Sequence, residues 1–148
     1  MSLEQKVTDA MKVAMKEKNR VALDSLRAVK AQILLVKTEQ KGAEVSEEQE
    51  IAILQRMIKQ RKDSYEQFTA QNRNDLAEVE EAQSKIIEAF LPKQLTAEEL
   101  ESEIKRIIAE AGAESIKDLG KVMGAASKEL AGKSDGKSIS EMAKKLLS

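Results

Sequence analysis

The chain has 148 residues, of which 41% are hydrophobic and 34% charged, and its formal net charge is −1. It contains no cysteine and no histidine, which excludes disulfides, thiolate nucleophiles, imidazole catalysis and the commonest zinc sites. We therefore expect no metal and no cofactor. No apolar run approaches the ~20 residues that cross a bilayer, and the start shows no signal-peptide pattern, so we expect a soluble cytoplasmic protein.

Blocks of opposite charge lie behind the near-neutral total. Residues 11–37 carry a net charge of +5, residues 75–101 carry −6 and residues 117–148 carry +3. Alternating blocks of this kind are usually solvated helix faces, so by themselves they do not define a binding site.

Two helices are predicted at the start of the chain. Apolar side chains recur at helical spacing over residues 3–17, which indicates the first helix. Asn19 can cap a second helix that runs to about Lys41, where Gly42 stops it. The expected inner faces are Leu3, Val7, Met11 and Ala14 in the first helix, and Leu23, Leu26, Val29, Ile33, Leu34 and Val36 in the second.

A third and a fourth helix are predicted before the single proline. Ser46 and Gln49 form a capping box that starts a helix over residues 47–72. Arg61 falls on the apolar seam of this helix, where a snorkelling or ion-paired arginine is the simpler interpretation. The expected seam is Ile51, Leu54, Ile58, Tyr65 and Phe68, and the fourth helix is lined by Leu76, Val79, Gln83, Ile86, Ile87 and Phe90.

Pro92 ends the fourth helix and indicates a domain boundary. Thr96 and Glu99 form a second capping box, after which we expect three short helices over residues 97–111, 116–131 and 139–147. Ser138 with Glu141 is expected to cap the last of them. No segment shows the period-two alternation of a strand. The sequence therefore predicts an all-α fold, with about four helices in residues 1–92 and a small three-helix bundle in residues 93–148.

Lysine and glycine are concentrated in residues 117–140, KDLGKVMGAASKELAGKSDGKSIS. At 100° per residue, Lys117, Lys121, Gly124 and Lys128 share one face of the predicted helix. The expected core side is Ile116, Leu119, Val122, Met123, Ala126 and Leu130.

Glycine inside a helix costs about 1 kcal/mol relative to alanine, so its presence needs a reason. Gly120 is expected to permit close packing of a neighbouring helix. Gly124 lies on the exposed lysine side, where a bare backbone lets a large anionic ligand approach.

The loop after this helix adds Lys133 and Lys137 beside Gly132 and Gly136, near the free amides expected at the start of the last helix. GKSDGKS is not a P-loop, because it follows a helix and lacks the four-residue spacer. No aromatic residue follows Phe90, which disfavours stacking of single-stranded bases. Spaced lysines suit the phosphate and ribose surface of a folded RNA; a merely solvated helix is the alternative.

DLGKVMGAASKELAGKSDGKSIS resembles the closing motif of the YqeY-like family, which is shared with the tail domain of the B subunit of the tRNA-dependent Asp/Glu amidotransferase (the GatB/YqeY domain). DAMKVAMKEKNRVALDSLRAVKAQI is similar to the family's opening helices, and RNDLAEVEEAQSKIIEAFLPKQLTAEEL is similar to its central segment. The resemblance covers essentially the whole chain. One departure is Ala126, where a bulkier residue is expected; it lies off the basic face.

The resemblance implies an all-helical protein whose C-terminal bundle contacts tRNA, as the amidotransferase tail domain does. The amidotransferase or aminoacyl-tRNA machinery is then a further candidate partner. The candidate nucleic-acid-binding residues are Lys117, Lys121, Gly124, Lys128, Gly132, Lys133, Gly136 and Lys137.

Three functions compete on these observations. The first is a non-catalytic tRNA-binding accessory module, and the second is a helical protein–protein interaction module that uses the seam of the third helix. The third is an enzyme, because the family is associated with carbon–nitrogen ligation with glutamine as amido donor. Asp63, Glu66 and Glu80 are its only candidate carboxylates. Nothing groups them with a nucleophile, so we expect no catalytic residues.

Overall fold

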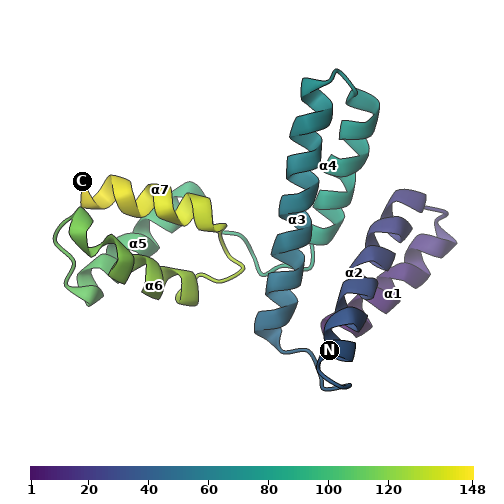
Figure 1. Ribbon diagram of the computed structural model, residues 1–148, viewed down its shortest axis with the longest axis horizontal. Coiled ribbons are helices and arrows are strands. Elements are labelled where there is room, and N and C mark those ends of the chain that lie inside the picture. Colours follow the sequence, from purple (N-terminus) through teal and green to yellow (C-terminus); the bar gives the residue numbers. More distant parts are fainter. The chain divides into compact units, whose positions relative to one another are not determined.

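The computed structural model describes residues 1–148 and consists of seven α-helices, one short 3₁₀ helix and no strand (Figure 1), which confirms the all-α prediction. The chain divides into two compact units, Met1–Leu91 and Pro92–Ser148. Each unit has its own hydrophobic core and is described by itself. None of the helices combines the length and the apolar character that crossing a bilayer requires.

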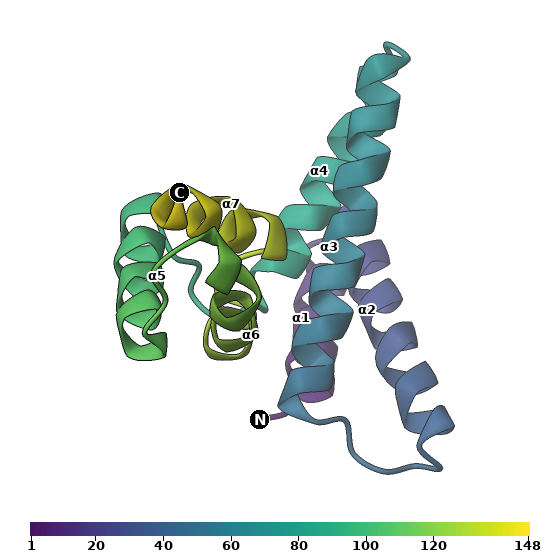
Figure 2. The same cartoon turned by 60° about the vertical axis from the view of Figure 1, so that its left-hand side comes forward.

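Two helix pairs form the first unit. α1 (Leu3–Lys16) packs against α2 (Arg20–Glu39), and α3 (Glu47–Ala70) packs against α4 (Asn74–Glu88). α2 also contacts α3 and α4, which joins the two pairs (Figures 1 and 2). The predicted helix starts are confirmed, because Asn19 accepts a hydrogen bond from the Ala22 amide and Ser46 forms a capping box with Gln49.

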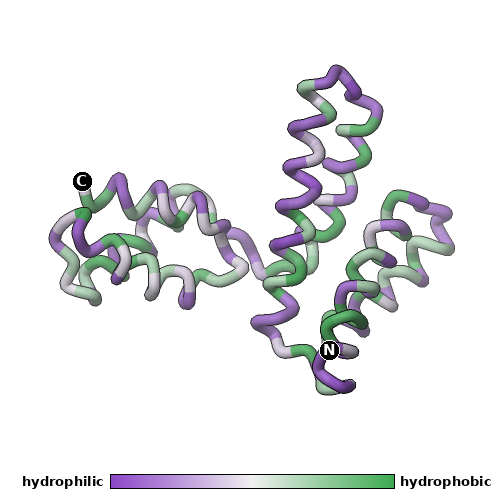
Figure 3. The backbone as a smooth tube through the Cα atoms, in the orientation of Figure 1, coloured by the Kyte–Doolittle hydropathy of each residue, from purple (hydrophilic) through white to green (hydrophobic).

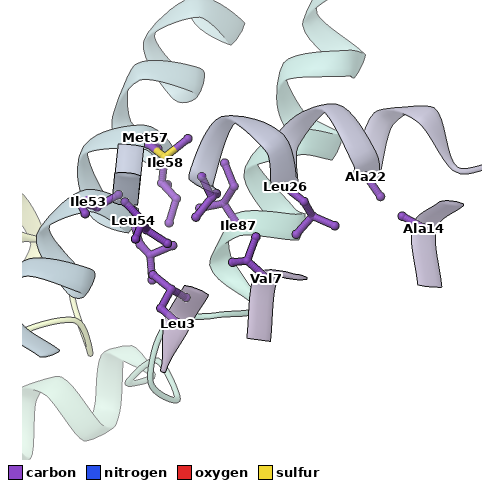
Figure 4. Packing of buried hydrophobic residues seen from close by; sticks show 12 residues of the cluster. Leu3, Val7, Ala14, Ala22, Leu26, Ile53, Leu54, Met57, Ile58 and Ile87 are labelled. Atoms are coloured by element: carbon purple, nitrogen blue, oxygen red, sulfur yellow. The ribbon is translucent and has the colours of Figure 1, made fainter. Parts of the chain in front are cut away.

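The core of the first unit gathers side chains from all four helices. Val7 of α1, Leu26 of α2 and Ile87 of α4 point toward one another (Figure 4), and Val7 and Ile87 are fully buried. Removing each such side chain from water contributes about 1.5–3 kcal/mol. Two predicted inner positions are wrong, because Leu34 is 45% exposed and Val79 is 42% exposed. Val79 lies in the part of α4 near the turn, outside the core cluster.

α3 enters this core by part of the predicted seam, Leu54 and Ile58, together with Ile53 and Met57, which were not predicted. Its buried side chains are Ile53, Leu54, Met57 and Ile58. Tyr65 is 37% exposed, because the α3–α4 pair continues past the N-terminal end of α2 and has no third helix to cover it there (Figures 1 and 2). The seam prediction is therefore wrong at Tyr65, whereas Phe68 is half-buried. Arg61 has no ion pair; its Nε donates to Gln83 Oε1 at 3.1 Å and its Nη1 to the Met57 carbonyl at 3.3 Å.

Three helices form the second unit. α5 (Ala97–Ala111), α6 (Leu119–Glu129) and α7 (Gly136–Leu147) pack pairwise against one another, and a 3₁₀ turn, η1 (Ile116–Asp118), precedes α6. Hydrophobic and hydrophilic stretches follow one another along each of these helices, green and purple in Figure 3. The predicted Thr96–Glu99 capping box is confirmed. The shared core comprises Leu100, Ile104, Ile107, Val122, Ala126, Leu130, Ile139, Ala143 and Leu147.

Two local predictions in the second unit are wrong. α7 begins at Gly136, and Asp135 caps it in place of Ser138, because the Asp135 side chain accepts the Ser138 amide hydrogen bond at 3.1 Å. Ile116 is 48% exposed. It belongs to a 3₁₀ turn with three residues per turn, which rotates it away from the core face of α6.

Candidate nucleic-acid interface

α6 and the turn before it carry three exposed lysines. Lys121 and Lys128 belong to α6 and Lys117 to η1, and all three side chains are exposed. The opposite side of α6 is anchored in the core by Val122 and Ala126, which are fully buried. Core packing therefore fixes the rotation of the helix about its axis and turns the lysines to solvent.

None of these three lysines forms an ion pair with a carboxylate. The ion pairs of the second unit involve other residues: Arg106 of α5 contacts Glu103, Glu110 and Glu129, and Lys105 contacts Glu101. The hydrogen bonds that Arg106 donates to Glu103, Glu129 and Glu110 raise the pKa of Arg106 above its ordinary value. Four of the ten acidic side chains of this unit therefore pair with basic residues of α5, and no ion pair neutralises Lys117, Lys121 or Lys128.

Gly120 and Gly124 add an uncovered stretch of backbone between these lysines. Both are exposed, and a Cβ atom built at either position would meet nothing within 4 Å. The expectation that Gly120 permits close packing of a neighbouring helix is therefore wrong. Neither glycine has the positive φ that other residues avoid, so nothing in the fold of the second unit requires glycine at these two positions.

Gly132 has a clear role in the backbone. It is buried, its φ is +77°, and its carbonyl accepts a hydrogen bond from the Gln94 side chain. The next carbonyl, of Lys133, accepts the Leu95 amide at 2.9 Å. These bonds tie the turn after α6 to the segment before α5, and they leave the Lys133 side chain exposed.

The start of α7 is less available to an anion than the sequence suggests. Asp135 accepts the Ser138 amide, and the Ser138 hydroxyl donates to the same carboxylate at 2.6 Å. A negative charge therefore already occupies the positive end of this helix. Gly136 and Lys137 lie in the first turn of α7, and both are exposed. Next to the Asp135 cap, Gly136 therefore leaves its backbone uncovered and Lys137 adds a positive charge.

Asp118 orders the turn that carries Lys117. Its carboxylate accepts the amides of Glu114 at 2.9 Å and Ser115 at 3.4 Å. These hydrogen bonds, with a smaller contribution from the charge of Lys121, hold the pKa of Asp118 below its ordinary value. The ionised form of Asp118 is thus the one that fixes the turn.

A hollow that the sequence prediction missed lies next to Lys133. It has a volume of about 440 Å³ and is lined by the starts of α5 and α7, with Leu100 and Met142 among its apolar residues. Lys145 also lines it. The available signal was helical spacing, since Ser138, Met142 and Lys145 follow one another by four and three residues on the same side of α7.

The three candidate carboxylates of an enzyme are not assembled into a site. Asp63 pairs with Lys59 at 3.2 Å on the surface of α3, and Glu66 is exposed on the same helix. Glu80 lines a hollow of the first unit that contains neither of them. No cluster of three or more acidic side chains is arranged to hold a metal ion.

Fold and surface together define a class: an all-α protein of two helical units, of which the second presents an unpaired lysine face. The chain belongs to the YqeY-like family, whose model, described as "Yqey-like protein", matches residues 4–147. A curated relative, "Altered inheritance of mitochondria protein 41, mitochondrial" of Meyerozyma guilliermondii, is 40% identical over 86 residues. That match covers 55% of this chain and 42% of the relative, so it spans about two fifths of the relative's length.

Proposed function

We propose that the protein is a non-catalytic tRNA-binding accessory module, related to the tRNA-dependent amidotransferase machinery, and that it binds RNA through the lysine–glycine face of α6. The observation that carries the proposal is the pair Gly120 and Gly124. Each costs about 1 kcal/mol of helix stability, each is exposed among unpaired lysines, and a Cβ atom would find open space at both. A ligand that approaches the helix backbone closely explains why glycine occupies these two positions despite its cost.

A folded RNA is the ligand class that suits this surface best. The second unit has no aromatic residue on which single-stranded bases could stack. Lysines spaced along a helix neutralise successive phosphates, and exposed backbone can approach riboses and phosphates in a shallow groove. Exposed Lys133 and Lys137 extend the charge beyond α6. The cytoplasm is the proposed compartment; the word mitochondrial in the relative's name refers to that protein.

Filter binding of labelled tRNA tests the proposal. We expect Lys121→Glu with Lys128→Glu to abolish retention, and the affinity of the wild type to fall with salt at a log–log slope of roughly −0.7 to −0.9 per phosphate contact. The matched control is Lys105→Glu with Lys144→Glu, which changes the net charge equally on α5 and α7. Retention that is equal in the two double variants would contradict the proposal.

A second candidate function, protein–protein interaction, draws support from exposed apolar side chains in the first unit. Leu34 and Leu35 of α2 and Tyr65 of α3 are each more than a third exposed. The amidotransferase or aminoacyl-tRNA machinery is the proposed partner class. Light scattering of the full chain tests its simplest form, self-association; a monomer at high concentration would rule that form out.

A further inference from the structure

Glu129 is the last residue of α6 and lies at the negative end of that helix. A carboxylate is disfavoured there, because the free carbonyl groups of the last turn carry partial negative charge. Lys128 is the basic residue of the same turn, but residues adjacent in sequence do not face each other on a helix. Glu129 therefore needs a cation from outside α6.

Arg106 of α5 supplies this cation. Its Nη2 donates to Glu129 Oε2 at 2.8 Å. The same guanidinium donates to Glu103 at 2.8 Å and to Glu110 at 3.0 Å, both on α5. Glu129 is thus the member of this cluster that belongs to α6, and its carboxylate is directed toward α5.

Stability alone is a weak explanation for the contact between Arg106 and Glu129. Their side chains are 42% and 44% exposed, and exposed ion pairs contribute little to folding. The packing of α5 against α6 already rests on the shared core, in which Ile104 and Val122 are fully buried. The contact has an electrostatic consequence, however: without Arg106, an unpaired negative charge would stand on α6 beside Lys128.

We propose that Arg106 is a positioning residue for the RNA surface of α6. It holds the Glu129 carboxylate on the α5 side of the helix, so that this acid does not compete with RNA phosphates for the lysines. Arg106 acts through Glu129 and does not itself contact the ligand, since three carboxylates already accept its hydrogen bonds. The inference rests on the proposed function, because it concerns how the same lysine surface stays available to RNA.

Lys105 and Glu101 of α5 provide a matched control pair. They form an ion pair at 3.4 Å with the same two charges. At 100° per residue, both lie on the flank of α5 opposite to the α5 partners of Arg106. Loss of Lys105 therefore removes one positive charge from α5, as loss of Arg106 does, without freeing a carboxylate of α6.

Filter binding of labelled tRNA to the full chain at low salt tests the inference. We expect Arg106→Gln to weaken binding roughly threefold and Lys105→Gln by less than about twofold, because a freed carboxylate repels phosphate most strongly at short range and low ionic strength. Adding Glu129→Gln to Arg106→Gln should restore the wild-type affinity, whereas adding Glu101→Gln should not. Substitutions at such exposed ion pairs should change stability little, which urea denaturation of each variant checks.

The outcomes separate this inference from the proposed function. If the wild type retains tRNA and Arg106→Gln binds it as tightly as Lys105→Gln does, Arg106 has no positioning role. The same conclusion follows if Glu101→Gln rescues Arg106→Gln as well as Glu129→Gln does, since only the total charge would then matter. Failure of the wild type to retain tRNA would instead contradict the proposed function, and the inference with it.

Discussion

At the scale of single residues, substitutions of the two exposed glycines of α6 should have opposite effects on stability and on tRNA affinity. Gly120→Ala and Gly124→Ala add a methyl group into open space, so each should stabilise the second unit by about 1 kcal/mol. The same methyl groups should reduce tRNA affinity, because they hold a ligand away from the backbone. Urea denaturation and filter binding measure the two effects on the same samples.

Gly112→Ala is the matched control for this pair. Gly112 ends α5 with a φ of +67°, a conformation that alanine avoids. This variant should lose stability and keep its tRNA affinity under native conditions. If Gly120→Ala and Gly124→Ala bind tRNA as tightly as the wild type does, then the backbone of α6 is not part of the interface.

Asp118 gives a pH-dependent prediction at the same scale. Its folded-state pKa is lowered, so its contribution to stability is present above the unfolded-state pKa and is lost as pH falls through the folded-state value. Asp118→Asn should therefore be less stable than the wild type at neutral pH, and the difference should shrink below about pH 4. Thermal unfolding of both proteins from neutral pH to pH 2 measures this; a constant difference would mean that the charge contributes nothing.

At the scale of helices, the sequence predicts correctly those features that depend on residues close together in the chain. Asn19, Ser46 and Thr96 were placed correctly as caps, because a cap satisfies amides within three residues of itself. The inner face of α3 was placed correctly at Leu54 and Ile58 and wrongly at Tyr65, because α2 lies beside only the first part of α3. The hollow that Glu80 lines could not be predicted either, since it exists only where α3 and α4 pair.

Two residues, Asp135 and Ser138, could each cap the start of α7, and substitutions can test which of them does. Ser138 with Glu141 fits the capping-box pattern, yet Asp135 is the cap that forms. Asp135→Ala should destabilise the second unit by about 1 kcal/mol and expose the amide of Ser138 to faster hydrogen exchange, because Asp135 accepts the hydrogen bond of that amide. Ser138→Ala should have a smaller effect, since its amide remains bound to Asp135. The reverse order of the two effects would contradict this cap assignment.

At the scale of the whole molecule, two separate cores predict separable losses of function. We expect Ile87→Ala in the first unit and Ile104→Ala in the second to cost about 2–5 kcal/mol each, because both side chains are fully buried. The second unit has only 57 residues, a size at which stability is marginal.

Ile104→Ala should therefore unfold the second unit and abolish tRNA retention, while the first unit keeps its protection from hydrogen exchange. Ile87→Ala should reduce the protection of the first unit from hydrogen exchange and leave tRNA retention unchanged. Hydrogen exchange read by mass spectrometry reports each unit in the same sample, and loss of protection in both units from either single substitution would show that the chain folds as one cooperative body.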